Sequence, residues 1–125
     1  MEHNMVGWFE IPVSDMERAK KFYDDVFDID IQVQDFHGTE MGWFPFSETK
    51  PGTAGSLIKN EAYQPSEEKG VLIYFSSPDI STQLKKVLDA GGKVLQAKTL
   101  IAEDAGFMGL FVDSEGNRIA LHARE

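Results

Sequence analysis

Residues 8–26 read WFEIPVSDMERAKKFYDDV, and residues 71–88 read VLIYFSSPDISTQLKKVL. Each stretch begins with the alternating pattern of a β-strand, passes through a short turn that contains an aspartate, and continues as an amphipathic helix. The aspartates that begin the two helices, Asp15 and Asp79, are 64 positions apart (79 − 15). This recurrence predicts that one structural unit is used twice along the chain.

Three further strands are expected after each predicted helix. Alternation and turn residues place them at 29–34, 40–46 and 54–59 in the first half, and at 93–97, 106–112 and 118–123 in the second. Each half is then a β-α-β-β-β unit, over about residues 6–60 and 70–125, with the polar segment 60–69 as a linker. A single unit leaves one sheet face exposed, so we expect one α+β domain whose two units form a curved mixed sheet, a half-barrel with the helices outside.

The two helices should pack on the sheets through apolar stripes at helical spacing. The first stripe is Ala19, Phe22, Tyr23, Val26 and Phe27, and the second is Ile80, Leu84, Val87 and Leu88.

The composition limits the partners that the protein can have. The 125 residues carry a formal net charge of −9, and an acidic surface repels phosphate backbones, so we expect no nucleic-acid partner. No apolar run is long enough to span a bilayer, and the first residues lack the basic start and apolar core of a secretion signal. The chain has no cysteine for disulfides or zinc ligation. We therefore expect a cytoplasmic protein without a membrane partner.

Three segments together resemble the vicinal oxygen chelate superfamily, which includes glyoxalase I, extradiol dioxygenases and bleomycin-resistance proteins. They are residues 12–27 (PVSDMERAKKFYDDVF), 70–95 (GVLIYFSSPDISTQLKKVLDAGGKVL) and 110–122 (LFVDSEGNRIALH). The third resembles the aspartate–x–acid–glycine turn that precedes the last strand in this family. The resemblance covers almost the whole chain, and it implies paired sheets, a cavity on their concave side and frequent homodimers.

Metal enzymes of this superfamily hold one divalent ion with histidine, glutamate or glutamine at four inward-facing strand positions. The resemblance puts these positions at Trp8, Ser56, Leu72 and Ala120. Indole, isobutyl and methyl groups supply no donor atom for a divalent ion. The resemblance therefore implies a family member without the usual metal centre and without a cofactor.

The same register predicts which side chains line the cavity. The candidate ligand-binding residues are Trp8, Glu10, Trp43, Ser56, Leu72, Tyr74, Ala120 and His122. An apolar floor with a few polar groups is the usual make-up of a small-molecule site. In this hypothesis Glu10, Tyr74 and His122 orient the ligand, while the two tryptophans and Phe44 offer stacking surface. The alternatives are that the tryptophans belong to the core or to a dimer contact, and that a register shift of one residue turns Glu10 to solvent.

Two functions are open at this point. The first is a homodimeric, glyoxalase- and bleomycin-resistance-like protein that binds a small organic molecule in the cleft between the units, where Glu10 favours a cationic ligand. The second is a lyase, isomerase or dioxygenase that holds one divalent metal near Glu10 and His122, joined by Glu40 or by a neighbouring chain. Glu10 and His122 could also form an acid/base pair without metal. The cavity could close within one chain or across a swapped dimer.

Overall fold

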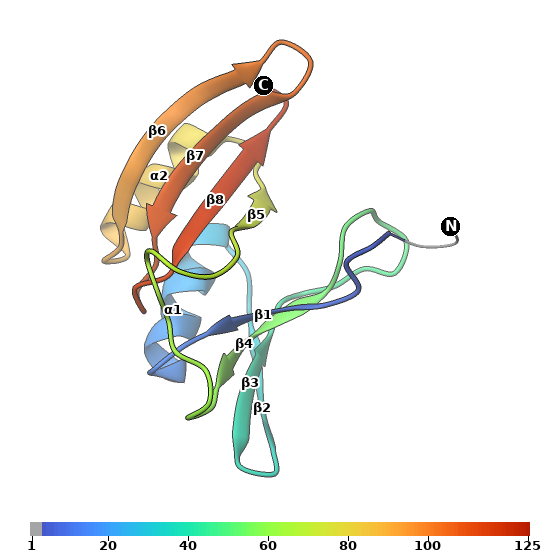
Figure 1. The fold of residues 1–125 in the computed structure, drawn as a ribbon, viewed down its shortest axis with the longest axis vertical. Helices are drawn as coiled ribbons and strands as arrows, with labels where there is room; N and C mark the ends of the chain where they lie inside the picture. The colour runs from blue at the N-terminus through green and yellow to red at the C-terminus, as the bar shows by residue number, and fades with distance from the viewer. Residues whose placement is uncertain (1–3) are drawn as a thin grey trace.

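The computed structural model describes residues 4–125, and in that part the elements follow the predicted repeat (Figure 1). In chain order they are β1 (Phe9–Pro12), α1 (Met16–Phe27), β2 (Gln32–Phe36), β3 (Thr39–Trp43), β4 (Gly55–Lys59), β5 (Ile73–Ser76), α2 (Ile80–Asp89), β6 (Lys93–Ala102), β7 (Gly106–Val112) and β8 (Arg118–Ala123). The first sheet has the order β1-β4-β3-β2, and the second has the order β5-β8-β7-β6. In each sheet the first strand runs parallel to the last strand of its half, and the other pairs are antiparallel. The fold is α+β, and the two sheets remain open and separate.

Both helices begin where the sequence predicts. The carboxylates of Asp15 and Asp79 accept hydrogen bonds from the backbone N–H groups of Arg18 and Thr82, each at 3.1 Å, and so cap α1 and α2. The predicted stripe of α1 is buried except for Phe27, which is partly buried. In α2 the prediction for Leu88 is wrong, because its side chain is 57% exposed while Gln83 is buried. At 100° per residue, Leu88 lies about 80° from Ile80 around the helix, and Gln83 lies about 60° away on the other side.

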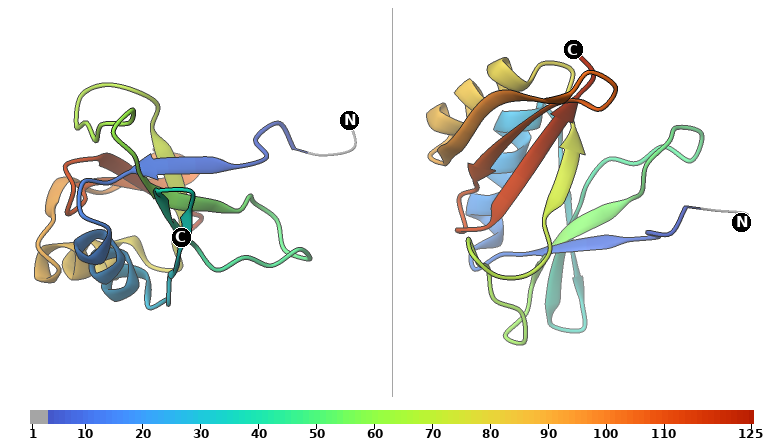
Figure 2. Two further views of the ribbon diagram at one scale, coloured as in Figure 1. Left: turned by 90° about the horizontal axis from the view of Figure 1, so that it is seen from below. Right: turned by 45° about the horizontal axis from the view of Figure 1, so that its top comes forward.

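The helices pack against each other, and each also covers one face of its own sheet (Figures 1 and 2). Ile11 and Leu57 are buried on the helix-facing side of the first sheet, and Phe111 and Leu121 on that of the second. We call the other side of each sheet, turned away from the helices, its open face. Neither helix in residues 4–125 has the length and apolar character of a membrane span.

Three of the six strands predicted after the helices differ from their ranges by more than one residue, and one of them, β3, ends at Trp43 rather than at Phe46. The second strand begins at Gln32 rather than at Ile29, because Ile31 is buried below the end of α1 and its N–H donates to the Asp24 carboxylate at 2.8 Å. Strand β6 continues to Ala102 rather than stopping at Ala97, since the register with β7 shifts at several bulges and pairing resumes after each.

Glu115, in a turn of the second half, binds the start of α1 in the first half. We call its contacts with Ser14, Asp15 and Arg18 the clamp. The Glu115 side chain is fully buried, and its carboxylate accepts hydrogen bonds at 2.8 Å from the backbone N–H groups of Ser14 and Asp15. The Arg18 guanidinium donates to the same carboxylate through Nε at 2.7 Å and Nη2 at 3.0 Å. Burial opposes ionisation of Glu115, but the hydrogen bonds from Arg18, Asp15 and Ser14 outweigh it and lower the pKa below the ordinary 4.5.

The flanking residues of this turn also reach the first half. The buried Tyr23 hydroxyl donates to the Asp113 carboxylate at 2.6 Å, and burial raises the pKa of both groups. Asp113 in turn accepts from the N–H groups of Glu115 and Asn117 and so stabilises the turn. The Asn117 amide donates to the Pro12 carbonyl at 2.7 Å. Residues 113–117 therefore fix β1 and α1 relative to the second sheet.

We expect Glu115→Gln to lower the free energy of unfolding at pH 7 by about 1–3 kcal/mol, since it removes charge-assisted hydrogen bonds from a buried acceptor. The folded-state pKa lies below the unfolded value, so the stabilisation is full above about pH 4.5 and is lost as the pH falls through the folded pKa. Urea unfolding at several pH values should show the gap between the two proteins closing on acidification. The control is Glu103→Gln, at an exposed glutamate that makes no ion pair within residues 4–125. Equal free energies of unfolding of the two variants at pH 7 would show that the Glu115 carboxylate does not stabilise the fold.

Candidate functional site

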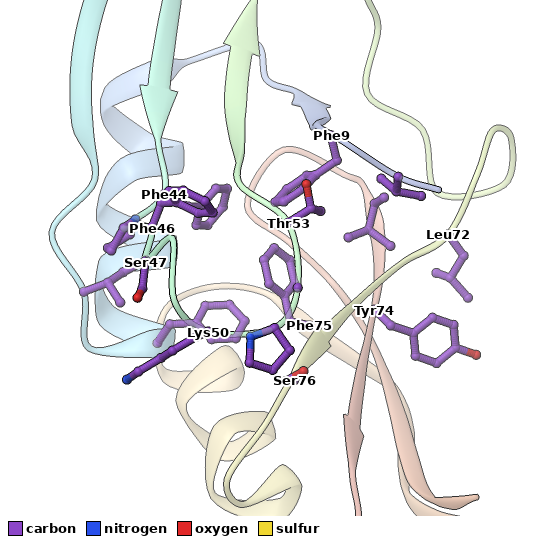
Figure 3. Close-up of a pocket in the computed structure, with 17 residues that line it drawn as sticks. Phe9, Phe44, Phe46, Ser47, Lys50, Thr53, Leu72, Tyr74, Phe75 and Ser76 are labelled. Carbon is purple, nitrogen blue, oxygen red and sulfur yellow. The ribbon is translucent and has the colours of Figure 1, made fainter. Parts of the chain in front are cut away.

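A cavity of about 770 Å³ lies where the two halves of the chain meet (Figure 3). Its walls come from β1, from the segment 44–53 between β3 and β4, and from β5 of the second sheet. Both halves must therefore be in place for this cavity to exist.

Phenylalanines make the floor of the cavity. The Phe75 ring of β5 lies 4.9 Å from the ring of Phe27, 5.3 Å from that of Phe44 and 5.8 Å from that of Phe9. In Figure 3 the rings of Phe9, Phe44 and Phe75 surround one common space. The ring of Phe9 has room because Gly55 is its neighbour on β4. A Cβ at that position would meet the ring at 2.2 Å.

Polar side chains stand at the edges of this floor. Ser47, Thr53, Tyr74 and Ser76 contribute hydroxyl groups, and Lys50 is the single charged residue that lines the cavity. No ion pair within residues 4–125 involves Lys50. In Figure 3 the Lys50 ammonium lies at one end of the cavity, whereas the Tyr74 side chain points away from the Phe75 ring on the other side of β5. The arrangement suits a molecule with an apolar body and a polar end.

Four of the sequence-predicted residues gather on the open face of the first sheet. The strand register places Glu10, Ser56 and Trp43 in one row across β1, β4 and β3. Trp8 packs edge-on against Trp43 with ring centroids 5.1 Å apart. Glu10 is exposed and makes no hydrogen bond or ion pair in the described part of the chain.

Phe36, which the sequence analysis did not select, extends this group. Its ring stacks on Trp43 at 6.3 Å. Trp8, Trp43 and Phe36 are 37%, 40% and 41% exposed, and together we call them the aromatic row.

The other four predicted residues belong to the second sheet. Tyr74 pairs with Ala120, and His122 pairs with Ser76. One ring nitrogen of His122, Nε2, is 2.6 Å from the Ala105 carbonyl oxygen and donates to it. Leu72 precedes β5 and lines the 770 Å³ cavity together with Tyr74. The eight predicted residues therefore form two groups, one on each sheet. Of the eight, only Leu72 and Tyr74 line the larger cavity.

The positions implied for a metal do not fit a divalent ion. Trp8 and Ser56 belong to the first half of the chain, at its sheet, and Leu72 and Ala120 belong to the second half, at the other sheet. The serine hydroxyl is the one oxygen among them, and it is buried. Within residues 4–125 no three histidine, cysteine or acidic residues are grouped so as to hold a metal ion.

The alternative site near Glu10 and His122 is not assembled either. Glu10 lies in β1 of the first sheet, whereas His122 lies in β8 of the second. Glu40 pairs with Lys59 in register and so points to the opposite face of the first sheet from Glu10.

Phe9 and Phe75 line the cavity although the sequence did not predict them as cavity residues. Both face the helices in their strands, and this pattern usually marks core positions. Their place beside the cavity depends on how the two sheets meet, which the alternation of a single strand does not specify.

The buried hydroxyl of Ser56 has no hydrogen-bond partner in the part of the chain that the structure describes. An unsatisfied buried polar group costs about 1–3 kcal/mol, so we expect Ser56→Ala to raise the free energy of unfolding by about 1 kcal/mol. Ser47→Ala, in an exposed segment, should change it by less than about 0.5 kcal/mol. Chemical denaturation measures both values. A destabilised Ser56→Ala protein would show that the hydroxyl has a partner.

Comparisons with known proteins agree with this architecture. The sequence model of the Glyoxalase/Bleomycin resistance protein/Dioxygenase superfamily matches residues 5–121. A glyoxylase-like domain-containing protein from Didymella fabae is 29% identical over 127 residues, which cover 98% of this chain and 95% of that protein.

Two solved structures show the same fold at low sequence identity. The V278E mutant of glyoxalase I from Zea mays aligns with a TM-score of 0.71 and 17% identity over 94% of this chain, which spans 45% of the maize chain. TnmS3, an antibiotic binding protein from Streptomyces sp. CB03234, aligns with a TM-score of 0.68 and 21% identity over 100% of this chain and 99% of its own. With the family match over nearly its whole length and the doubled β-α-β-β-β architecture, the chain belongs to the glyoxalase/bleomycin resistance protein/dioxygenase superfamily.

Proposed function

We propose that this protein binds a small, planar and largely apolar organic molecule in the 770 Å³ cavity, without the usual metal centre of its family. The observation that carries the proposal is the phenylalanine floor, to which both halves of the chain contribute. Ligand sites of about 300–1,000 Å³ hold drug-sized molecules, and this cavity falls within that range.

The chemistry of the walls narrows the class of ligand. Aromatic rings bind planar apolar groups through offset or edge contacts. Glu10 does not line this cavity, and Lys50 is its single charged residue. The cavity therefore favours a neutral molecule or one with an anionic group, rather than the cationic ligand that Glu10 suggested from the sequence. That TnmS3 is an antibiotic binding protein of this fold agrees with a binding role.

We also propose that the protein is a homodimer in which the second copy covers the aromatic row. Large aromatic side chains are enriched at protein interfaces. Trp8, Trp43 and Phe36 lie together on one open face, where the described residues leave them partly exposed.

The cavity proposal predicts saturable binding of 1-anilinonaphthalene-8-sulfonate, which has an apolar ring system and one anionic group. Thr53 lies beside Phe9 in Figure 3, so an indole in its place would take up space next to the phenylalanine floor. We expect Thr53→Trp to weaken binding by at least about tenfold, or about 1.4 kcal/mol. Titration followed by dye fluorescence and by calorimetry measures the affinity.

Thr49→Trp is the matched control, since Thr49 lies in the same loop, is exposed and does not line the cavity. It should bind the dye as the unchanged protein does. Equal affinities of the two tryptophan variants, both with cooperative thermal unfolding, would place the dye elsewhere and reject the cavity as the site.

The dimer proposal predicts a mass in solution of about twice the 14.0 kDa of one chain, measured by light scattering after gel filtration. Phe36→Asp introduces a charge into the aromatic row and should shift the protein toward the single-chain mass. Tyr63→Asp, at an exposed tyrosine outside this row, should leave the mass unchanged. A single-chain mass for the unchanged protein would refute the dimer.

A further inference from the structure

A second cavity, of about 240 Å³, lies between β1, the segment 64–71 and β8. Ile73 is the one residue that it shares with the larger cavity. Its charged lining residues are Glu10, Lys69 and Arg118. The family's metal positions and the phenylalanine floor are both absent from its lining, so it is a separate place in the fold.

Arg118 lines this cavity, and its guanidinium has no acceptor among residues 4–125. Its Nε is buried and has no hydrogen-bond partner, and its side chain makes no ion pair within residues 4–125. In contrast, Arg18, Lys20, Lys21, Lys59 and Lys93 all pair with carboxylates. Because Nε is inaccessible, a ligand can reach the guanidinium only through its two terminal nitrogens. Such a pair of parallel N–H donors matches the two oxygens of a carboxylate.

The other charges of the cavity are unpaired as well. The Lys69 ammonium and the Glu10 carboxylate have no partner among the described residues, although both line the cavity that Arg118 lines. The Asn117 amide, in contrast, is engaged by the Ser66 N–H and the Pro12 carbonyl and forms a fixed wall. Two cations and one carboxylate therefore stand free around a small space in a chain whose net charge is −9.

We infer that this cavity binds a small zwitterion of amino-acid size. The ligand carboxylate accepts from the terminal nitrogens of Arg118 and lies near Lys69, and the ligand ammonium donates to Glu10. A space of 240 Å³ corresponds to about eight water molecules at about 30 Å³ each, which suits a ligand of about six to ten non-hydrogen atoms. This ligand is distinct from the planar molecule proposed for the larger cavity, so either proposal can fail alone.

Nuclear magnetic resonance tests the inference directly. The Nε–H of Arg118 is shielded from water, so its proton should exchange slowly and give an observable signal. Three probes of similar size separate the charges: L-alanine, propionate and ethylamine. We expect L-alanine to shift the Arg118 Nε–H signal saturably with a Kd on the order of 1–10 mM. Propionate should bind about two- to fivefold more weakly, and ethylamine should cause no saturable shift.

Single substitutions test which charged group of the ligand each side chain binds. Arg118→Gln should abolish the shifts that L-alanine causes in the backbone signals of residues 66–71. Glu10→Gln should remove the preference for L-alanine over propionate and leave propionate binding unchanged. Arg124→Gln, at an exposed arginine outside the cavity, is the control and should bind as the unchanged protein does. Absence of a saturable shift with L-alanine overturns the inference. Equal binding of L-alanine and propionate to the unchanged protein overturns the role of Glu10 and with it the zwitterion.

Discussion

The buried carboxylate of Glu115 at the start of α1 is the interaction on which the arrangement of the two halves depends. The two sheets share no strand pairing, so their relative position must come from side chains. Glu115 accepts from the N–H of Asp15, the N-cap residue of α1, and from that of Ser14 before it, and it also binds Arg18. A charged acceptor at this helix end is favourable because the N-terminus carries partial positive charge. A capping interaction that is usually local is here made between residues 100 positions apart.

The clamp at Glu115 and the phenylalanine floor hold the same interface at two places. The clamp fixes the N-terminal end of α1, whereas Phe27, at the C-terminal end of the helix, packs on Phe75 of the second sheet. Tyr23 connects them, since its hydroxyl donates to Asp113 and its ring packs edge-on against Phe44 at 5.5 Å. One helix of three turns thus links the polar turn of the second half to the cavity. The shape of the cavity therefore depends on the position of α1 relative to the second sheet.

The repeat predicted the order of the elements because it depends on local signals: period-two alternation, a capping aspartate and helical spacing. The alternation along β1 is a local signal as well, and it places the buried Ile11 and the exposed Glu10 on opposite faces. The site was harder to predict, because it depends on contacts between residues far apart in the sequence. Phe75 looks like an ordinary core residue in its own strand, and only its neighbours from the first half make it part of a cavity.

The two kinds of candidate site differ in what they require from the chain. Phe9 and Phe75 face the helices, and the clamp brings them together, so a single chain can form the larger cavity. The groups around Ser56 and Ala120 lie on the open faces of two different sheets, and the helices pack on the opposite, helix-facing sides. A site that used both open-face groups at once would need another surface to join them, and a second copy is the simplest source of one. Trp8, Leu72 and Ala120, at positions that the family resemblance implies for a metal, offer no side-chain donor that would join those faces around an ion. The intrachain cavity then becomes the site that this sequence supports most directly.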